Sequence, residues 1–136
     1  MEVTEEIIPI TNRGVICLSM ILNKVGAIFI PVSDIRKARE WYCSLLNLEP
    51  TYEILFDHLC CIPMDNNGLN IVLDSKIYMK DSYAKTPMFH FNTDDIHQAY
   101  QFLQEKGVEI VTNIEHGHSF NIQDPDGNML MICKVS

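Results

Sequence analysis

The chain has little positive charge for its size. Ten lysines and arginines stand against eighteen aspartates and glutamates in 136 residues, which gives a formal net charge of −8. An acidic surface repels phosphate backbones and anionic lipid headgroups, so we expect neither nucleic acid nor a membrane as a partner. Long apolar runs are also missing, because none reaches the roughly 18–20 residues of a membrane-spanning helix.

Paired cysteines are missing as well. The five cysteines are odd in number and form no C-x-x-C motif, so we expect neither a disulfide framework nor a zinc knuckle. This usage favours a reducing compartment and predicts a cytoplasmic protein. The G-x-G-x-x-G, P-loop and G-x-S-x-G motifs are absent, so the sequence lacks these nucleotide-binding and hydrolase signatures. What remains, 47% hydrophobic and 21% charged residues, is typical of a globular protein.

The N-terminal 19 residues differ from the rest of the chain. They carry Glu2, Glu5 and Glu6 where an export signal would carry positive charge. We expect residues 1–19 to be a peripheral extension upstream of a natural start at Met20. An added edge strand near residues 15–18 is the alternative. Residues 20–136 are expected to form a single domain.

An internal repeat organises that domain. Residues 32–38 (VSDIRKA) match residues 93–99 (TDDIHQA) at an offset of 61. An apolar stretch precedes the motif in both copies, and an amphipathic helical pattern follows it. Ser33 and Asp94 are placed to cap the two helices.

Each predicted helix is followed by three short strand-like runs with turn residues between them. These runs are 52–56, 58–63 and 70–73 in the first copy, and 109–114, 119–123 and 129–134 in the second. With an opening strand before each helix, the chain reads as two β-α-β-β-β modules, at about 23–75 and 88–135, joined by a linker at 76–87. Alternation puts aliphatic and aromatic side chains on one face of the strands and mixed side chains on the other. Two such mixed faces would enclose a cleft.

Three stretches carry a family resemblance. Residues 32–48 resemble the opening signature of the vicinal oxygen chelate superfamily, which contains glyoxalase I, fosfomycin-resistance enzymes, extradiol dioxygenases and bleomycin-resistance proteins. Residues 93–108 resemble the second-module counterpart, and residues 120–128 (FNIQDPDGN) the closing signature. The resemblance implies an α+β fold of two tandem βαβββ modules that form a cupped mixed sheet with helices outside, commonly assembled as homodimers.

The resemblance also implies where a metal ion would bind. Metal-dependent members carry a histidine seven residues before the helix-opening aspartate of each module and a glutamate three residues past the closing asparagine. Those positions are Ala27, Met88 and Met131 here, and the fourth is Asn70 or Val72. Alanine and valine cannot ligate, and a methionine thioether suits soft copper(I). We therefore expect no metal and no cofactor.

Histidines supply the candidates for a replacement site. His90 lies two residues past Met88 and so points to the same side of its strand. A functional histidine and a histidine that is merely hydrogen-bonded in the cleft wall are equally good interpretations of it. His58 could serve in metal or acid–base chemistry. The simpler interpretation is a histidine that is exposed at the end of a strand. Asp74 reads as a strand terminator, and residues 116–118 (HGH) as a hairpin loop.

Three classes of function follow. The leading hypothesis is a metal-independent small-molecule-binding protein with its ligand in the cleft. The expected ligand-binding residues are Phe29, Met88, His90, Ser119, Asn121 and Met131. The runner-up is a lyase, isomerase or dioxygenase-like enzyme whose relocated acid–base or metal site uses His90, His58 and a carboxylate. The third is an interaction module without a small ligand, because a fold alone does not define a function.

The 61-residue repeat makes a specific prediction about the cleft. It places Phe29 and His90 at equivalent strand positions, where an aromatic ring would oppose an imidazole and clamp a flat ligand. We expect His90 to be buried among Met88, Met129 and Met131, which would keep its imidazole neutral. We also expect a homodimer, because two modules close only part of a cupped sheet.

Overall fold

The computed structural model describes residues 20–65 and 68–135. The expectation for residues 1–19 therefore lies outside the described residues. The first module contains β1 (Ala27–Pro31), α1 (Ile35–Leu45), β2 (Ile54–Leu55), β3 (Leu59–Pro63) and β4 (Asn70–Asp74). The second contains β5 (His90–Thr93), α2 (Ile96–Glu105), β6 (Glu109–Ile110), β7 (Ser119–Gln123) and β8 (Met129–Lys134).

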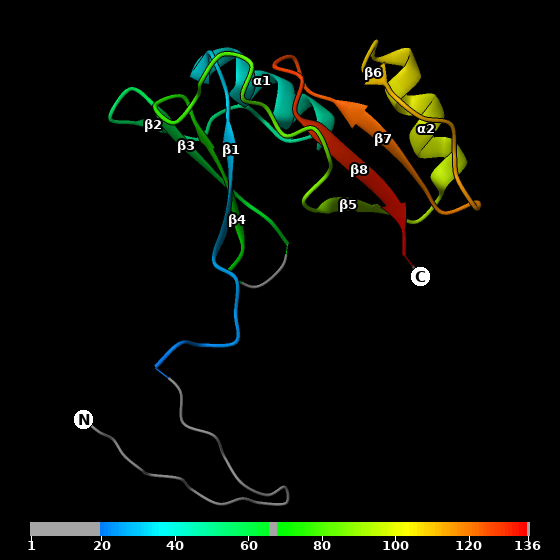
Figure 1. Cartoon of the computed structure of the whole chain (residues 1–136), viewed down its shortest axis with the longest axis horizontal. Coiled ribbons are helices and arrows are strands. Elements are labelled where there is room, and N and C mark those ends of the chain that lie inside the picture. Colours follow the sequence, from blue (N-terminus) through cyan, green and yellow to red (C-terminus); the bar gives the residue numbers. More distant parts are fainter. Residues whose placement is uncertain (1–19, 66–67, 136) are drawn as a thin grey trace, which may run out of the picture.

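The two modules repeat one sheet topology. The first sheet has the strand order β1-β4-β3-β2 and the second β5-β8-β7-β6. In each sheet the first strand pairs in parallel with the last, and the remaining pairs are antiparallel. Figure 1 shows the first sheet on the left and the second on the right, with α1 above them. The predicted α+β fold of two βαβββ modules in a cupped sheet is confirmed.

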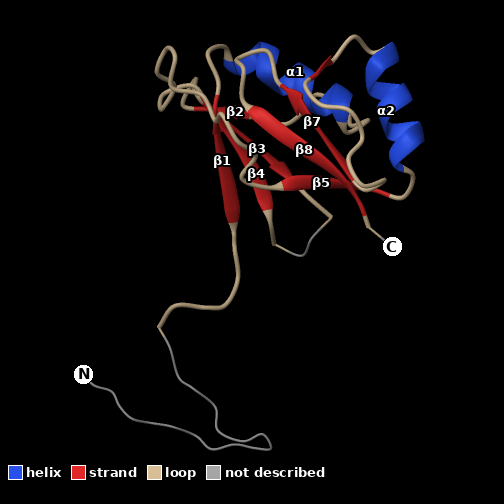
Figure 2. Cartoon of the chain, turned by 45° about the vertical axis from the view of Figure 1, so that its right-hand side comes forward, coloured by secondary structure: helices blue, strands red, loops and turns tan. Residues whose placement is uncertain are grey.

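The helices lie on one side of the two sheets (Figure 2), and a hydrophobic core lies beneath them. Alternate strand residues such as Ile30, Leu73 and Phe120 are buried in one hydrophobic cluster that draws on both modules. The Lys106 ammonium group at the end of α2 donates to the Ser44 hydroxyl on α1 at 3.0 Å. We call the opposite face of each sheet, turned away from the helices, the inner face. No helix in the described part of the chain is long and apolar enough to cross a membrane.

The helix caps differ from the expectation by one residue. Asp34 caps α1, where its Oδ1 accepts from the amides of Arg36 and Lys37. Asp95 caps α2 by accepting from the amide of Gln98. Ser33 and Asp94 were the wrong choices, because the extended backbone of the residue after each of them brings its carboxylate to the free amides of the first turn.

A hydrogen-bonded loop between β7 and β8 fastens the modules together. The Tyr42 hydroxyl of α1 donates to Asp124 Oδ2 at 2.6 Å, and the Ser33 amide donates to Asp126 Oδ2 at 2.9 Å. Asn128 Nδ2 donates to the Pro31 carbonyl of β1 at 2.8 Å. Burial, followed by the neighbouring Asp124 carboxylate, raises the pKa of Tyr42 well above its ordinary value. The hydroxyl therefore stays a donor in this bond.

Candidate functional site

A cavity of about 350 Å³ lies at the seam between the modules, and we call it the seam cavity. β1 and the start of β8 contribute to its wall, together with the segment that precedes β5. The lining residues are Ala27–Pro31, Ala84, Met88, Phe89 and residues 128–130. The loop network described above closes one end of the seam, because it ties β1 to Asn128.

Two large apolar side chains of the seam cavity are open to solvent. Phe29 is 58% exposed on the inner face of β1, and Met88 is 84% exposed before β5. Removing apolar surface from water is favourable, so a ligand that covers these side chains is stabilised. Ligand pockets are therefore commonly lined by apolar side chains. Phe29 and Met88, both predicted from the sequence, do line one cavity.

The polar groups of the cavity wall are few. Asn128 is the polar side chain of the lining and is 1% exposed. Its Nδ2 donates to the Pro31 carbonyl and to Asp124 Oδ2, and its Oδ1 accepts from the Ala84 amide. No ionisable side chain is part of the lining. The chemistry of the cavity is therefore that of an uncharged, mainly apolar compartment.

The other four expected ligand-binding residues share the inner face of the second sheet. Strand register puts His90 beside Met131, and Met131 beside Asn121, in a row across β5, β8 and β7. Ser119 lies two residues from Asn121 on the same face of β7. None of these four lines the seam cavity. The structure thus separates the six residues into a cavity pair and an inner-face group.

His90 does not have the environment expected for it. Its side chain is exposed, although we expected burial among three methionines. The reason is that β5 is an edge strand of its sheet, so the inner face near His90 lacks a covering neighbour. His90 instead borders a second cavity of about 530 Å³, where Met64, Asp65 and Phe91 are among its neighbours.

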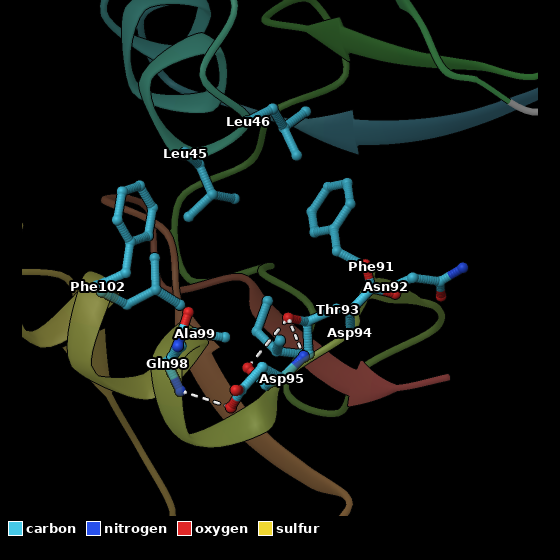
Figure 3. A pocket seen from close by; sticks show the side chains of 12 residues that line it. Leu45, Leu46, Phe91, Asn92, Thr93, Asp94, Asp95, Gln98, Ala99 and Phe102 are labelled. Carbon is cyan, nitrogen blue, oxygen red and sulfur yellow. Dashed lines mark hydrogen bonds between the residues drawn. The ribbon is translucent and has the colours of Figure 1, made fainter. Parts of the chain in front are cut away.

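A third cavity of about 430 Å³ lies on the helix side, where the end of α1 meets the start of α2. Figure 3 shows Leu45, Leu46 and Phe102 around its apolar part, with Asp94 and Asp95 at the polar end. The Asp95 carboxylate and the Thr93 hydroxyl are engaged in hydrogen bonds at the helix start. These polar groups serve the fold of α2, and we place the candidate site at the seam.

A histidine–aspartate pair lies away from the three cavities. His58 Nδ1 is 2.9 Å from Asp74 Oδ1, with the side chains 24% and 8% exposed. Because a carboxylate only accepts hydrogen bonds, the His58 Nδ1 is the donor in this contact. Asp74 does end β4, as predicted, but it also orients His58. His58 follows two residues with positive φ, Phe56 at 52° and Asp57 at 63°, so the turn that presents it is strained.

The metal positions implied by the family resemblance can now be placed. Val72 pairs with Phe29 as Met131 pairs with His90, so the fourth position is Val72. Together with Ala27 and Met88, these positions carry no hard oxygen or nitrogen side-chain donor. Within the described residues, no group of three or more His, Cys, Asp or Glu side chains could hold a metal ion. The residues present do not fit the metal centre of the family.

Several residues of the seam cavity were not predicted from the sequence. Asn128 was included only in the closing signature at residues 120–128, and Pro31, Ala84 and Phe89 were not among the expected ligand-binding residues. The alternation that placed Phe29 on the inner face also includes Pro31, so this residue was within reach. Ala84 and Asn128 depend on how the linker folds across the seam, where the Met129 amide donates to the Ala84 carbonyl at 2.8 Å.

Comparison with known proteins agrees with this architecture. The chain is 30% identical over 118 residues to biphenyl-2,3-diol 1,2-dioxygenase 2 of Rhodococcus globerulus, over 79% of this chain and 60% of that protein. It therefore spans less than two thirds of this relative. Among solved structures, the antibiotic binding protein TnmS3 of Streptomyces sp. CB03234 matches with a TM-score of 0.66 and 22% identity, covering 87% of this chain and all of TnmS3.

A second structure, lactoylglutathione lyase of Agrobacterium tumefaciens, matches with a TM-score of 0.62 and 16% identity, over 83% of this chain and 94% of the lyase. At these identities the structures share the fold. A family model, described as the Glyoxalase/Bleomycin resistance protein/Dioxygenase superfamily, matches residues 24–132. This range includes both modules, all eight strands except the end of β8, and both helices. The chain belongs to the glyoxalase/bleomycin resistance protein/dioxygenase superfamily.

Proposed function

We propose that the protein binds a small, uncharged and largely apolar molecule in the seam cavity, without a metal ion. The observation that carries this proposal is the composition of the wall, where exposed Phe29 and Met88 face a compartment without ionisable side chains. A ligand that covers these side chains gains the free energy of burying their apolar surface. His90, Ser119, Asn121 and Met131 would contact those parts of a ligand that extend onto the inner face.

The names of two similar proteins support the proposal that the ligand is aromatic or similarly apolar. The name of the Rhodococcus relative gives biphenyl-2,3-diol as its substrate, and TnmS3 is described as an antibiotic binding protein. Binding without conversion is the better proposal here, because Ala27, Val72, Met88 and Met131 occupy the metal positions of the family. Elemental analysis of purified protein should find no stoichiometric zinc, nickel, manganese or iron. About one chelatable ion per chain would contradict metal independence.

Binding in the seam cavity is tested with a pair of methionine variants. A thermal-shift screen of uncharged aromatic compounds identifies a ligand, and calorimetric titration measures its dissociation constant. Met88→Asp places a charge in the apolar wall and should weaken binding at least roughly tenfold, since a buried carboxylate without a partner is costly. Met79→Asp is the matched control, because Met79 is exposed but does not line the cavity. Equal losses in the two variants would contradict the proposed location.

A second candidate function rests on the His58–Asp74 pair. An imidazole oriented by a carboxylate, with Nε2 free to accept a proton, is a common general base. The runner-up hypothesis joined His58 with His90, but the two line no common cavity among those described above. Incubation of the protein with its identified ligand, followed by mass spectrometry, tests this enzyme function. Turnover lost in His58→Ala and kept in His97→Ala would support it.

The proposal includes an assembly and a location. We expect a homodimer, because apolar side chains outside the seam cavity, such as Phe56 and Ile77, are exposed and a second copy would cover them. Cys43, Cys60, Cys61 and Cys133 are free thiols, and this supports a cytoplasmic location.

A further inference from the structure

Along β1, the backbone N–H and C=O groups of successive residues point alternately toward β4 and toward the seam. The Asn70 amide donates to the Gly26 carbonyl at 2.9 Å, and the Val32 amide donates to the Asp74 carbonyl at 3.2 Å. In a parallel pair, the residues between such contacts direct both N–H and C=O away from the partner strand. Ala27, Phe29 and Pro31 therefore present their backbone groups to the seam, because β1 is the edge of its sheet.

One of these outward groups already binds an amide. The Pro31 carbonyl accepts from Nδ2 of Asn128, which belongs to the other module. Phe29 lies on the same edge, two residues before Pro31. Its N–H and C=O have no hydrogen-bond partner anywhere in the described part of the chain. They lie in the wall of the seam cavity, beside the Asn128 amide whose own polar atoms are occupied.

A ligand in the cavity would cut these backbone groups off from water. A buried donor or acceptor without a partner costs more than a typical hydrogen bond contributes, so the ligand must replace the lost water. In an extended residue N–H and C=O point the same way, and they match a group that carries an acceptor and a donor side by side. A lactam, imide or primary amide has this arrangement, whereas an ionised group would find no counter-charge in the lining.

We propose that the ligand of the seam cavity is an uncharged molecule with a lactam-like amide edge, which pairs with the backbone N–H and C=O of Phe29. This inference rests on the proposed binding function and names the chemical class of the ligand. The ligand body lies between the Phe29 and Met88 side chains, and its amide continues the line of contacts that Asn128 begins at Pro31.

Two isosteric probes test the amide edge. In 2-quinolinone a ring N–H adjoins the carbonyl, and in coumarin a ring oxygen replaces that N–H. Calorimetric titration should give roughly fivefold to tenfold tighter binding of 2-quinolinone, the effect of one hydrogen bond. In ¹⁵N-edited NMR spectra, the Phe29 amide should exchange rapidly in the free protein and become protected when 2-quinolinone binds.

Two variants assign the effect to the backbone of Phe29. Phe29→Ala and Phe29→Pro both lose the aromatic ring, but only the proline variant loses the N–H. Proline is tolerated on an edge strand where the N–H does not join the ladder. The preference for 2-quinolinone over coumarin should persist in Phe29→Ala and disappear in Phe29→Pro.

The outcomes separate this inference from the proposed function. Equal affinities for the two probes, with shifts of the Ala84 and Met129 resonances, would overturn the amide edge and leave binding in the seam cavity intact. A Phe29 amide that is protected before any ligand is added would mean that another strand covers the edge, and this result also overturns it. Absence of binding by both probes, with unshifted cavity resonances, would count against both proposals.

Discussion

Asn128 shows how one side chain can join parts of the chain that are distant in sequence. Its amide group contacts Pro31 of β1 and Ala84 of the linker, and its backbone N–H donates to Asp124 at 2.8 Å. The side chain is buried, so its bonds form away from competing water. This residue therefore joins β1, the linker and the loop before β8 across the seam.

Replacement of Asn128 by alanine tests this role. We expect Asn128→Ala to lower the free energy of unfolding by about 2–4 kcal/mol, because it leaves buried partners unsatisfied. Urea denaturation followed by circular dichroism measures the loss. Asn121→Ala is the matched control and should cost less than about 1 kcal/mol, since the Asn121 side chain has no hydrogen-bond partner within the described residues. A loss of equal size in both variants would contradict the role of Asn128.

The buried thiol of Cys60 makes the free energy of unfolding depend on pH in the alkaline range. Burial raises the pKa of Cys60 to about 11, against about 8.5 for a thiol in an unfolded chain. As pH rises, the unfolded state loses this proton first, so the free energy of unfolding falls between roughly pH 8.5 and 11. The stabilisation is fully present below pH 8.5.

Alkaline unfolding of two cysteine variants checks this linkage. In Cys60→Ala the free energy of unfolding should fall less steeply over this pH range than in the wild-type protein. Cys61→Ala should keep the wild-type slope, because Cys61 is exposed on the same strand. Burial also raises the pKa of Tyr42, so the free energy of unfolding should still fall with pH to some extent in both variants. An unchanged slope in Cys60→Ala would contradict the assignment.

At the scale of elements, the two helices end in the same way with different residues. Asn47 follows α1 with φ 57°, and Gly107 follows α2 with φ 75°. In both modules the amide of the following residue donates a hydrogen bond to a carbonyl in the last turn of the helix. The Leu48 amide donates to the Cys43 carbonyl, and the Val108 amide donates to the Leu103 carbonyl. Glycine adopts this left-handed conformation without the steric cost of a side chain.

Exchange of these two residues makes a matched experiment. Asn47→Gly should raise the free energy of unfolding by about 0.5–1 kcal/mol, and Gly107→Asn should lower it by a similar amount. Both positions are exposed, so packing changes little. Chemical denaturation at neutral pH measures both variants. Changes of the same sign would show that the backbone conformation does not decide the effect.

The strands show what local pattern predicts and where it stops. β7 and β8 have the bounds expected from alternation and turn residues, because each lies in the middle of its module's ladder. The expected runs 52–56 and 109–114 shorten to two paired residues in β2 and β6. These are edge strands, and their pairing ends where the neighbouring strand turns away, which their own residues do not encode.

The same limit explains the candidate site. Alternation placed Phe29, His90, Asn121 and Met131 correctly on the inner faces, since this requires only the period of a strand. It could not place Phe29 and His90 in separate cavities, because that depends on how two modules pack across the seam. The contacts that set this packing, such as Asn128 with Pro31, join residues that are distant in sequence. A repeat of 61 residues relates the modules, but it carries no information on their contact.

At the scale of the whole molecule, charge and exposed apolar surface oppose each other. The formal net charge of −8 makes two copies repel, while exposed apolar side chains outside the seam cavity, such as Phe56 and Ile77, favour association. Salt screens charges that lie further apart than a Debye length, which shortens from about 30 Å at 0.01 M to about 10 Å at 0.1 M. Apolar contacts are not weakened by this screening.

The balance predicts a homodimer that salt strengthens. Sedimentation equilibrium at micromolar concentration should show a dimer whose dissociation constant falls severalfold between roughly 0.01 M and 0.1 M sodium chloride, because screening removes repulsion between the acidic chains. Ile77→Asp adds charge and removes exposed apolar surface outside the seam cavity, so it should weaken the dimer, whereas Asp94→Glu keeps the charge and should not. A species of monomer mass alone at every salt concentration would contradict the homodimer. A dimer weakened by Met88→Asp and unaffected by Ile77→Asp would instead place the interface over the seam, and the edge of β1 would then be closed to a ligand in the assembled protein.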